Sequence, residues 1–235
     1  LAEDNTSEAF LVNAKGPKLL ATLCHEKNIP LLHLSTDYIF SGITQADKGL
    51  ISENASPLPP GVYAKSKYLG ELEIKKNLHR FVILRLSSIF SSEANCFPRA
   101  IILRALEFGQ LNIVNDQITG PTRSKSIAKV MQIIIKHYSD GHSIDWGIYN
   151  FTQQPFLSWY DFGRHIIAKA AQRNRQLKGT IINPVSSAEF GAKAPRPMNS
   201  SLDSSKVMKT FNVPKYLGNW EADLDQTIDE IISQI

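Results

Sequence analysis

The sequence has 235 residues, of which 43% are hydrophobic and 20% charged, so it is long enough for a globular chain with a sizeable core. Its 26 basic and 22 acidic residues give a net charge of +4, but the basic residues are dispersed, which argues against a nucleic-acid partner. No apolar run reaches the roughly 18 residues of a membrane span. Two cysteines cannot build a disulfide framework, and we expect a cytoplasmic protein without a membrane partner.

The amino-terminal part begins with a predicted helix at residues 5–28, where apolar residues recur at helical spacing. Gly16 and Pro17 fall inside it and are expected to kink or restart the helix. The short apolar run at residues 31–34 predicts a buried parallel strand, which leads into the polar tripeptide at residues 35–37.

A stretch rich in glycine and proline at residues 41–61 predicts a long surface loop, and loops of this length are often functional. An amphipathic helix is predicted at residues 63–77 and an apolar strand at residues 81–86. The order helix, strand, loop, helix, strand implies right-handed crossovers. We therefore expect an α/β fold with a Rossmann-like, doubly wound parallel sheet.

The second half has a different pattern, which predicts a smaller α+β domain packed on the edge of the sheet. We place the boundary after residue 92, so that residues 1–92 belong to the nucleotide-binding domain and residues 93–235 mainly to a substrate-binding domain, with some segments returning to the sheet. Helices are predicted at residues 97–108, 124–138, 158–172 and 220–235, and strands at residues 112–115 and 147–151.

Tyr63 and Lys67 are the first candidate catalytic pair, because four residues of helix place their side chains on one face. A phenol has a pKa near 10, and lowering it by about three units requires about 4 kcal/mol. An ammonium group about 4 Å away supplies about that much at an effective dielectric constant near 20. The pair alone arises easily by chance, however, and could be a half-buried tyrosine beside a solvated lysine.

Ser35, Thr36 and Asp37 supply the context that the pair needs. They follow a predicted parallel strand, and open α/β sheets bind ligands at the carboxyl ends of their strands. Their polar side chains could orient a carbonyl or hydroxyl group beside the tyrosine, although a turn cap is the simpler alternative. His33, inside the strand, is expected to be a core residue, and no histidine pair has the spacing of a zinc site, so no metal is expected.

Several motifs occur in a characteristic order along the whole chain: STDYIFSG, VYAKSKYLGE, FVILRLSSIF, NDQITGPT and RPMNSSLD. In this order they resemble the dTDP-4-dehydrorhamnose reductase family of extended short-chain dehydrogenases/reductases. The resemblance implies hydride transfer from NADPH, or NADH, to the 4-keto group of dTDP-6-deoxy-L-lyxo-4-hexulose, which yields dTDP-L-rhamnose.

The resemblance also assigns roles to individual residues. Tyr63 would donate the proton, and Lys67 would lower its pKa and bind the nicotinamide ribose. Thr36 would tune the proton transfer and bind the sugar, and Ser35 would lie on the cofactor side. The residues expected on the nucleotide-sugar substrate are Thr36, Asp37, Ser88, Arg196 and Asn199. For Arg196, a structural ion pair is an equally good interpretation.

Two departures from the family pattern stand out. Ser88 occupies a position where family members often carry a tryptophan, which bears on substrate identity. The family's opening Gly-x-x-Gly-x-x-Gly segment, whose backbone amides hold the cofactor pyrophosphate, has no match here, so we expect the amino-terminal dinucleotide-binding segment to be missing and NADPH binding to be weak.

Three further possibilities remain open from the sequence. The chain also resembles the non-catalytic regulatory subunit of methionine adenosyltransferase at STDY and YAKSK. It could equally be an inactive fragment of a reductase. A homodimer is possible.

Overall fold

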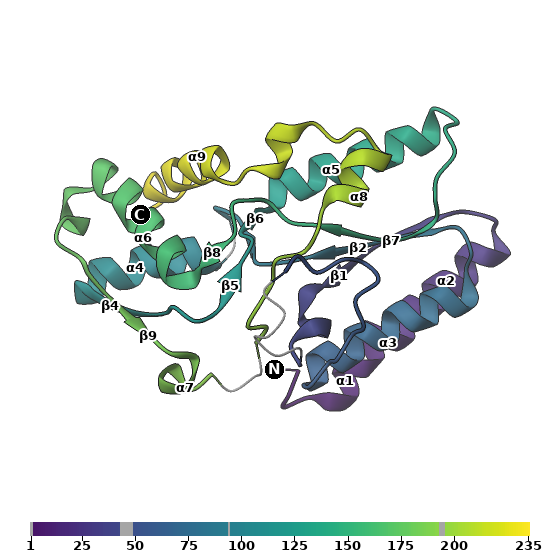
Figure 1. The fold of residues 1–235 in the computed structure, drawn as a ribbon, viewed down its shortest axis with the longest axis horizontal. Coiled ribbons are helices and arrows are strands. Elements are labelled where there is room, and N and C mark those ends of the chain that lie inside the picture. The colour runs from purple at the N-terminus through teal and green to yellow at the C-terminus, as the bar shows by residue number, and fades with distance from the viewer. Residues whose placement is uncertain (1, 43–48, 94, 193–195) are drawn as a thin grey trace.

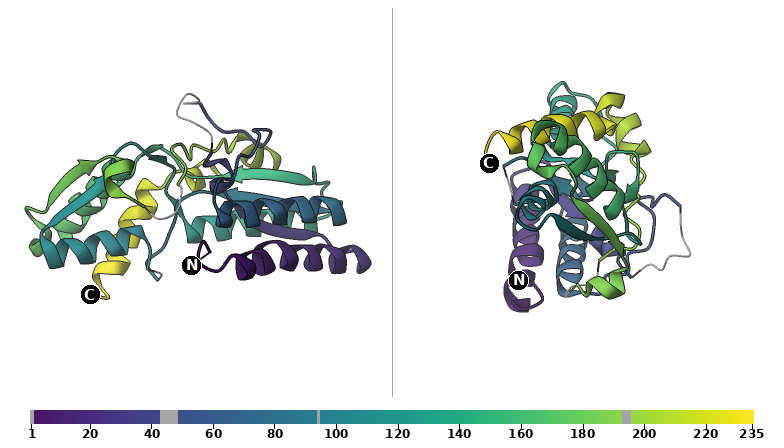
Figure 2. Two further views of the ribbon diagram at one scale, coloured as in Figure 1. Left: turned by 90° about the horizontal axis from the view of Figure 1, so that it is seen from below. Right: turned by 90° about the vertical axis from the view of Figure 1, so that its left-hand side faces the viewer.

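The structure is a computed structural model that describes residues 2–42, 49–93, 95–192 and 196–235. Its elements form two lobes that lie end to end (Figures 1 and 2). One lobe is built on a three-stranded parallel sheet and the other on a two-stranded parallel sheet. None of the described helices is both long and apolar enough to cross a membrane.

The first lobe contains the sheet of strands β1 (Leu31–Thr36), β2 (Phe81–Leu86) and β7 (Gly147–Phe151), in the order β1–β2–β7. Successive side chains of a strand point to opposite faces. Leu84 of β2 therefore packs with α5 (Ser124–Ser139) and α8 (Ser205–Thr210), and Ile83 packs with helices on the other face. Figure 1 shows helices on both faces, and the doubly wound α/β fold is confirmed.

The other face of this sheet carries α1 (Thr6–Phe10), the π-helical turn η1 (Leu11–Lys15), α2 (Gly16–Glu26) and α3 (Val62–Asn77). The kink predicted at Gly16 and Pro17 takes the form of this π-helical turn, and Gly16 itself keeps helical backbone angles. A π-turn loosens the hydrogen-bond ladder, so that Pro17, which has no N–H, fits into the first turn of α2. Helices α2 and α3 pack against each other, as Figure 2 shows.

A short 3₁₀ helix, η2 (Asp37–Phe40), follows β1 and directly precedes the loop predicted at residues 41–61. Residues 43–48 of that loop lie outside the described residues. Farther along, Ile51 forms an isolated bridge with Leu202, and both side chains are buried with Phe40 in one small cluster. The loop is therefore attached to a segment about 150 residues later in the chain.

The second lobe has its own core around the parallel pair of β4 (Gln110–Val114) and β9 (Ile181–Val185). Phe162 and Trp220 are fully buried there. The helices around this core are α4 (Phe97–Phe108), α6 (Trp159–Arg173), η3 (Arg175–Leu177), α7 (Ser187–Phe190) and α9 (Glu221–Ile232), whereas η4 (Lys215–Gly218) packs its Leu217 into the core of the first lobe. Two-residue strands connect the lobes: β3 (Ile89–Phe90) pairs with β6 (Thr122–Arg123), and β5 (Ile118–Thr119) pairs with β8 (Leu157–Ser158).

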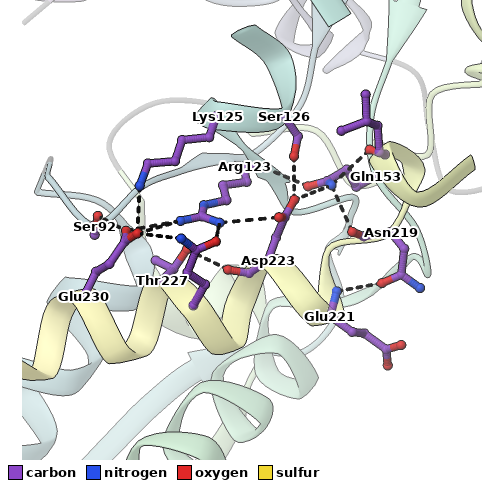
Figure 3. A network of polar contacts seen from close by, with 12 residues as sticks. Ser92, Arg123, Lys125, Ser126, Gln153, Asn219, Glu221, Asp223, Thr227 and Glu230 are labelled. Carbon is purple, nitrogen blue, oxygen red and sulfur yellow. Dashed lines mark hydrogen bonds and ion pairs between the residues drawn. The ribbon is translucent and has the colours of Figure 1, made fainter. Parts of the chain in front are cut away.

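A polar network at the start of α5 holds α9 in place (Figure 3). Arg123 is only 3% exposed, and its Nη2 donates to both carboxylate oxygens of Glu230 at 3.1 and 3.2 Å. Lys125 lies 2.7 Å from the same carboxylate, and Ser126 donates to Asp223 at 2.5 Å. Hydrogen bonding from Lys125, together with that from Ser92, lowers the pKa of Glu230 to about 2. These contacts connect α9 to the start of α5, the helix that packs on the sheet of the first lobe.

Candidate active site

The candidate site lies where the carboxyl end of β1 meets the first turns of α3. Gly61 begins this helix without a side-chain cap. The carboxylate of Glu3 takes that role, because it accepts hydrogen bonds from the backbone N–H groups of Val62 at 3.0 Å and Tyr63 at 3.2 Å. Two amides that a helix end normally leaves without partners are thus satisfied, and the negative charge lies at the positive end of the helix dipole.

Tyr63 lies beside Thr36, and the two side chains form a hydrogen bond. Its ring also contacts Tyr38 edge-on, with 5.4 Å between the ring centroids. Burial raises the pKa of Tyr63 above its ordinary value of 10.0, and the hydrogen bond with Thr36 opposes this only in part. The lowering expected from Lys67 is not observed. The phenol is therefore protonated at neutral pH, as a proton donor must be.

Lys67 reaches from α3 to the main chain of β1. Its ammonium group donates to the carbonyl oxygen of Leu34 at 2.8 Å, which is its one hydrogen bond among the described residues. Two of its three N–H donors therefore remain for another group. Burial lowers the pKa of Lys67, whereas the negative charge of Glu71 raises it. His33, on the same strand, has its pKa lowered to about 4 by burial and by the charge of Lys67, and its Nε2 is buried without a partner.

Asp37 is buried, and its carboxylate is already occupied by neighbouring hydroxyl groups. Ser200 donates to one oxygen at 2.5 Å, and Thr36 donates to the other at 3.2 Å. Ser87 also hydrogen-bonds to it. Burial raises the pKa of Asp37 despite these bonds. The structure thus uses Asp37 to attach the RPMNSSLD segment to the end of β1.

Ser35 points toward α3 rather than toward the open end of the strand. Its hydroxyl donates to Glu71 Oε1 at 2.5 Å, and Glu71 forms a buried ion pair with Arg85 of β2, with 2.7 Å between Nη2 and Oε2. The sequence interpretation did not include Glu71 or Arg85. The motif VYAKSKYLGE contains Glu71 eight residues after Tyr63, so helical spacing was the available signal for it.

The remaining predicted residues lie around Asp37 and Tyr38. Ser88 has a left-handed backbone (φ 45°) and hydrogen-bonds to Thr119 and to Ser87. Asn199 donates to the carbonyl oxygen of Gly49 at 3.1 Å and accepts from the Ser201 amide at 2.9 Å. Arg196 is exposed, and its positive charge acts on the Tyr38 hydroxyl, whose pKa is nevertheless raised by burial.

The donors in this site fit the nicotinamide ribose of a dinucleotide. A half-buried phenol and an ammonium with two unused N–H groups come from one face of α3, one helical turn apart, and ribose hydroxyls are acceptors for such donors. Among the described residues, no cluster of histidine, cysteine, aspartate or glutamate is arranged to hold a metal ion. A separate pocket of about 600 Å³ lies between α4, β4, β9 and α7, and its described lining includes none of the predicted site residues.

Comparisons with known proteins agree with this geometry. The family model described as the RmlD substrate binding domain matches residues 1–233. A dTDP-4-dehydrorhamnose reductase from Aggregatibacter actinomycetemcomitans is 35% identical over 212 residues, which cover 90% of this chain and 71% of the relative. This chain belongs to the dTDP-4-dehydrorhamnose reductase family. The resemblance seen in the sequence is confirmed.

Two solved structures of dTDP-4-dehydrorhamnose reductases show how far the likeness extends. The protein from Clostridium acetobutylicum has 26% sequence identity and a TM-score of 0.84, and the match covers 100% of this chain and 76% of that one. The protein from Bacillus anthracis, solved in complex with NADP, has 27% identity and a TM-score of 0.83 over 97% of this chain and 75% of that one. The reductase interpretation is thereby favoured over a regulatory subunit.

Proposed function

We propose that this chain reduces the 4-keto group of dTDP-6-deoxy-L-lyxo-4-hexulose to give dTDP-L-rhamnose, with NADPH or NADH as the reductant. The observation that carries the proposal is the placement of Tyr63 beside Thr36 at the carboxyl end of β1, one helical turn before Lys67 on α3. Family membership and the NADP-bound relative support the choice of reaction and cofactor.

The chemical step that the residues of this chain carry out is the donation of a proton to a developing alkoxide. A nicotinamide cofactor bound here would supply a hydride to the carbonyl carbon, and the carbonyl oxygen would take the electron pair of the broken π bond. The Tyr63 O–H bond then breaks, and its proton forms the new hydroxyl group of the sugar. An alkoxide is a much stronger base than a phenolate, so the raised pKa of Tyr63 does not hinder this transfer.

Lys67 and Thr36 support that proton transfer. The unused N–H groups of Lys67 would bind the cofactor ribose. The Thr36 hydroxyl, which donates to Asp37, lies beside the Tyr63 hydroxyl and would accept a hydrogen bond from a hydroxyl group of the sugar. Ser35 would support the cofactor-binding part of the site indirectly. Its hydroxyl donates to Glu71, which lies one helical turn after Lys67.

Substrate binding is assigned to the residues around the end of β1. Asp37 would orient the sugar through the hydroxyl groups that it holds, together with Ser88 and Asn199. Arg196 is the candidate partner for the diphosphate, because it is exposed and electrostatically coupled to Tyr38.

We also propose the division of the chain into two domains at residue 92. Beyond that residue, α5 and β7 return to the sheet of the first lobe. A homodimer, a cytoplasmic location and the lack of a nucleic-acid partner stay predictions.

The test is turnover by the protein expressed from its natural reading frame. NADPH consumption is measured with and without the keto-sugar, and the nucleotide product is identified by chromatography and mass spectrometry. We expect consumption that depends on the keto-sugar, with one dTDP-L-rhamnose formed per NADPH used. A protein that binds the nucleotide sugar or the cofactor but forms no product would support the non-catalytic alternative instead.

A further inference from the structure

Two buried charged side chains face each other beneath the catalytic helix. Glu71 of α3 is 1% exposed and Arg85 of β2 is 2% exposed. The Arg85 Nε donates to Glu71 Oε1 at 3.0 Å, and its Nη2 donates to Oε2 at 2.7 Å. A two-point contact between a planar guanidinium and a planar carboxylate has a defined direction as well as a distance. It therefore fixes how the helix lies on the strand.

This ion pair connects the elements that carry the two parts of the site. Tyr63, Lys67 and Glu71 are four residues apart, so they share one face of α3. On the sheet, Ser35 pairs in register with Arg85 and directly precedes Thr36. The hydroxyl of Ser35 also donates to Glu71, so both strands hold the same carboxylate.

Stability alone is a weak explanation for these charges. Taking an ion pair out of water is costly, and well-packed apolar residues of similar size often serve stability as well or better. The same face of β2 is otherwise apolar, with Phe81 and Ile83 packed against α2 and α3. What the ion pair adds is a fixed position for α3 and a negative charge one turn from Lys67.

We propose that Glu71 and Arg85 are positioning residues, whose ion pair sets the position of α3 along β1 and so holds Tyr63 and Lys67 against the end of that strand. Arg85 is anchored in turn, because its Nη1 donates to the carbonyl oxygen of Glu53 at 3.2 Å and its guanidinium lies over the ring of Phe40. This inference rests on the proposed function of Tyr63 and Lys67.

The first test uses Glu71→Asp, which keeps the charge but is one methylene shorter, so it cannot hold Arg85 and Ser35 unless α3 moves. We expect kcat to fall about tenfold or more, because small misplacements of reacting groups have effects of that size. The KM for the keto-sugar should stay within about twofold, since the residues assigned to substrate binding lie outside α3. Glu230→Asp is the matched control. It also shortens a carboxylate side chain that binds a buried arginine, but this contact lies where α9 meets the start of α5 (Figure 3).

The second test separates position from stability. In the double variant Glu71→Met with Arg85→Met, apolar side chains of similar volume replace the pair, and the fold should be as stable as the wild type. We expect its kcat to remain at least about tenfold low. If this stable double variant regains wild-type kcat, or if folded Glu71→Asp keeps it, the proposal is overturned.

A third measurement does not depend on turnover. Carbon-13 labelling of tyrosine gives seven tyrosine signals, and the Tyr63 signal is identified by its loss in Tyr63→Phe. We expect Glu71→Asp to shift the Tyr63 signal and Glu230→Asp to leave it in place. An unmoved Tyr63 signal in Glu71→Asp would contradict the proposal. A wild type without reductase activity would instead count against the proposed function, and the labelling experiment would still decide on the positioning role.

The pH profile gives a readout that a purely structural role would not move. Among the described residues, the groups coupled electrostatically to Lys67 are Glu71 on its own helix and His33 on β1. In Glu71→Gln the negative charge is gone, so Lys67 should lose its proton at a lower pH. The alkaline decline of kcat is expected to begin at lower pH than in the wild type, and an unchanged profile would contradict this part of the role.

Discussion

At Gly70, α3 packs closely on the amino-terminal helices. A Cβ atom added there would lie well inside 3.0 Å of the Asn13 carbonyl oxygen in η1, a separation that real Cβ atoms essentially never show, and 3.4 Å from Pro17 Cγ. The obstacle is main chain, which cannot turn away as a side chain can. Gly70→Ala therefore requires α3 and η1 to separate, and such overpacking typically destabilises by about 1–3 kcal/mol.

The expected size follows from two opposing effects. Alanine is about 1 kcal/mol better than glycine inside a helix. Because the clash involves main chain, we expect the overpacking cost to lie at the upper end of its range, so Gly70→Ala should lose about 2 kcal/mol of unfolding free energy. Gly16→Ala is the matched control, since Gly16 is helical and the nearest atom to an added Cβ, Leu11 O, is 3.8 Å away. Because the ring of Pro17 disfavours a preceding helical residue that has a Cβ, this cost offsets the gain from alanine, and the variant should stay within about 1 kcal/mol of the wild type.

Urea unfolding followed by circular dichroism measures both variants. The prediction is a lower midpoint for Gly70→Ala and a midpoint near that of the wild type for Gly16→Ala, with equal slopes. If Gly70→Ala proves as stable as Gly16→Ala, the close contact between α3 and η1 is refuted.

Two other predictions concern groups beside the catalytic pair. Because the pKa of His33 is lowered to about 4, the unfolded chain takes up a proton first as the pH falls below 6.5, so stability should decline from there toward pH 4. At about pH 5, urea unfolding should show a loss of about 1–2 kcal/mol relative to pH 7 that is absent in His33→Leu; parallel pH dependence in both proteins would contradict it. Glu3→Ala should remove the cap of α3 and cost about 0.5–1 kcal/mol, with Glu8→Ala as the control, and equal melting of the two variants would argue against the cap.

The parts of the site that the sequence predicts correctly depend on local patterns. Helical spacing placed Tyr63 and Lys67 on one face of a helix, and the apolar run before Ser35 marked the strand end where ligands bind in α/β sheets. The structure brings Thr36 and Tyr63 together as these two rules require. Strand boundaries were less exact: the strand expected at residues 112–115 is Gln110–Val114.

The parts that the sequence does not reveal depend on long-range contacts. The hydrogen bond between Asp37 and Ser200 joins residues 163 positions apart, and no local pattern announces it. No local pattern indicates that Glu71 and Arg85 are buried together, because their contact depends on how a helix packs on a strand. Strand β9 contains Pro184, which ordinarily argues against a strand but is tolerated at the edge of a two-stranded sheet.

The direction of the Tyr63 pKa shift could not be predicted from the sequence alone. The sequence suggested that Lys67 alone would lower this pKa. In the fold, the ammonium group of Lys67 hydrogen-bonds to the Leu34 carbonyl, and burial of the phenol has the largest effect on the pKa of Tyr63. Spacing along a helix gives proximity, but desolvation depends on the elements that close over the side chain.

Proton donation by Tyr63 is the central claim, and the most direct measurement compares Tyr63→Phe with Tyr68→Phe on the same helix. NADPH oxidation by the protein from its natural reading frame is followed under single-turnover conditions with the keto-sugar. Removal of a general acid should lower the rate by about 10²–10⁴-fold in Tyr63→Phe, while cofactor binding and the Tyr68→Phe rate stay near wild type. A Tyr63→Phe variant that reduces the keto-sugar at the wild-type rate would contradict the account.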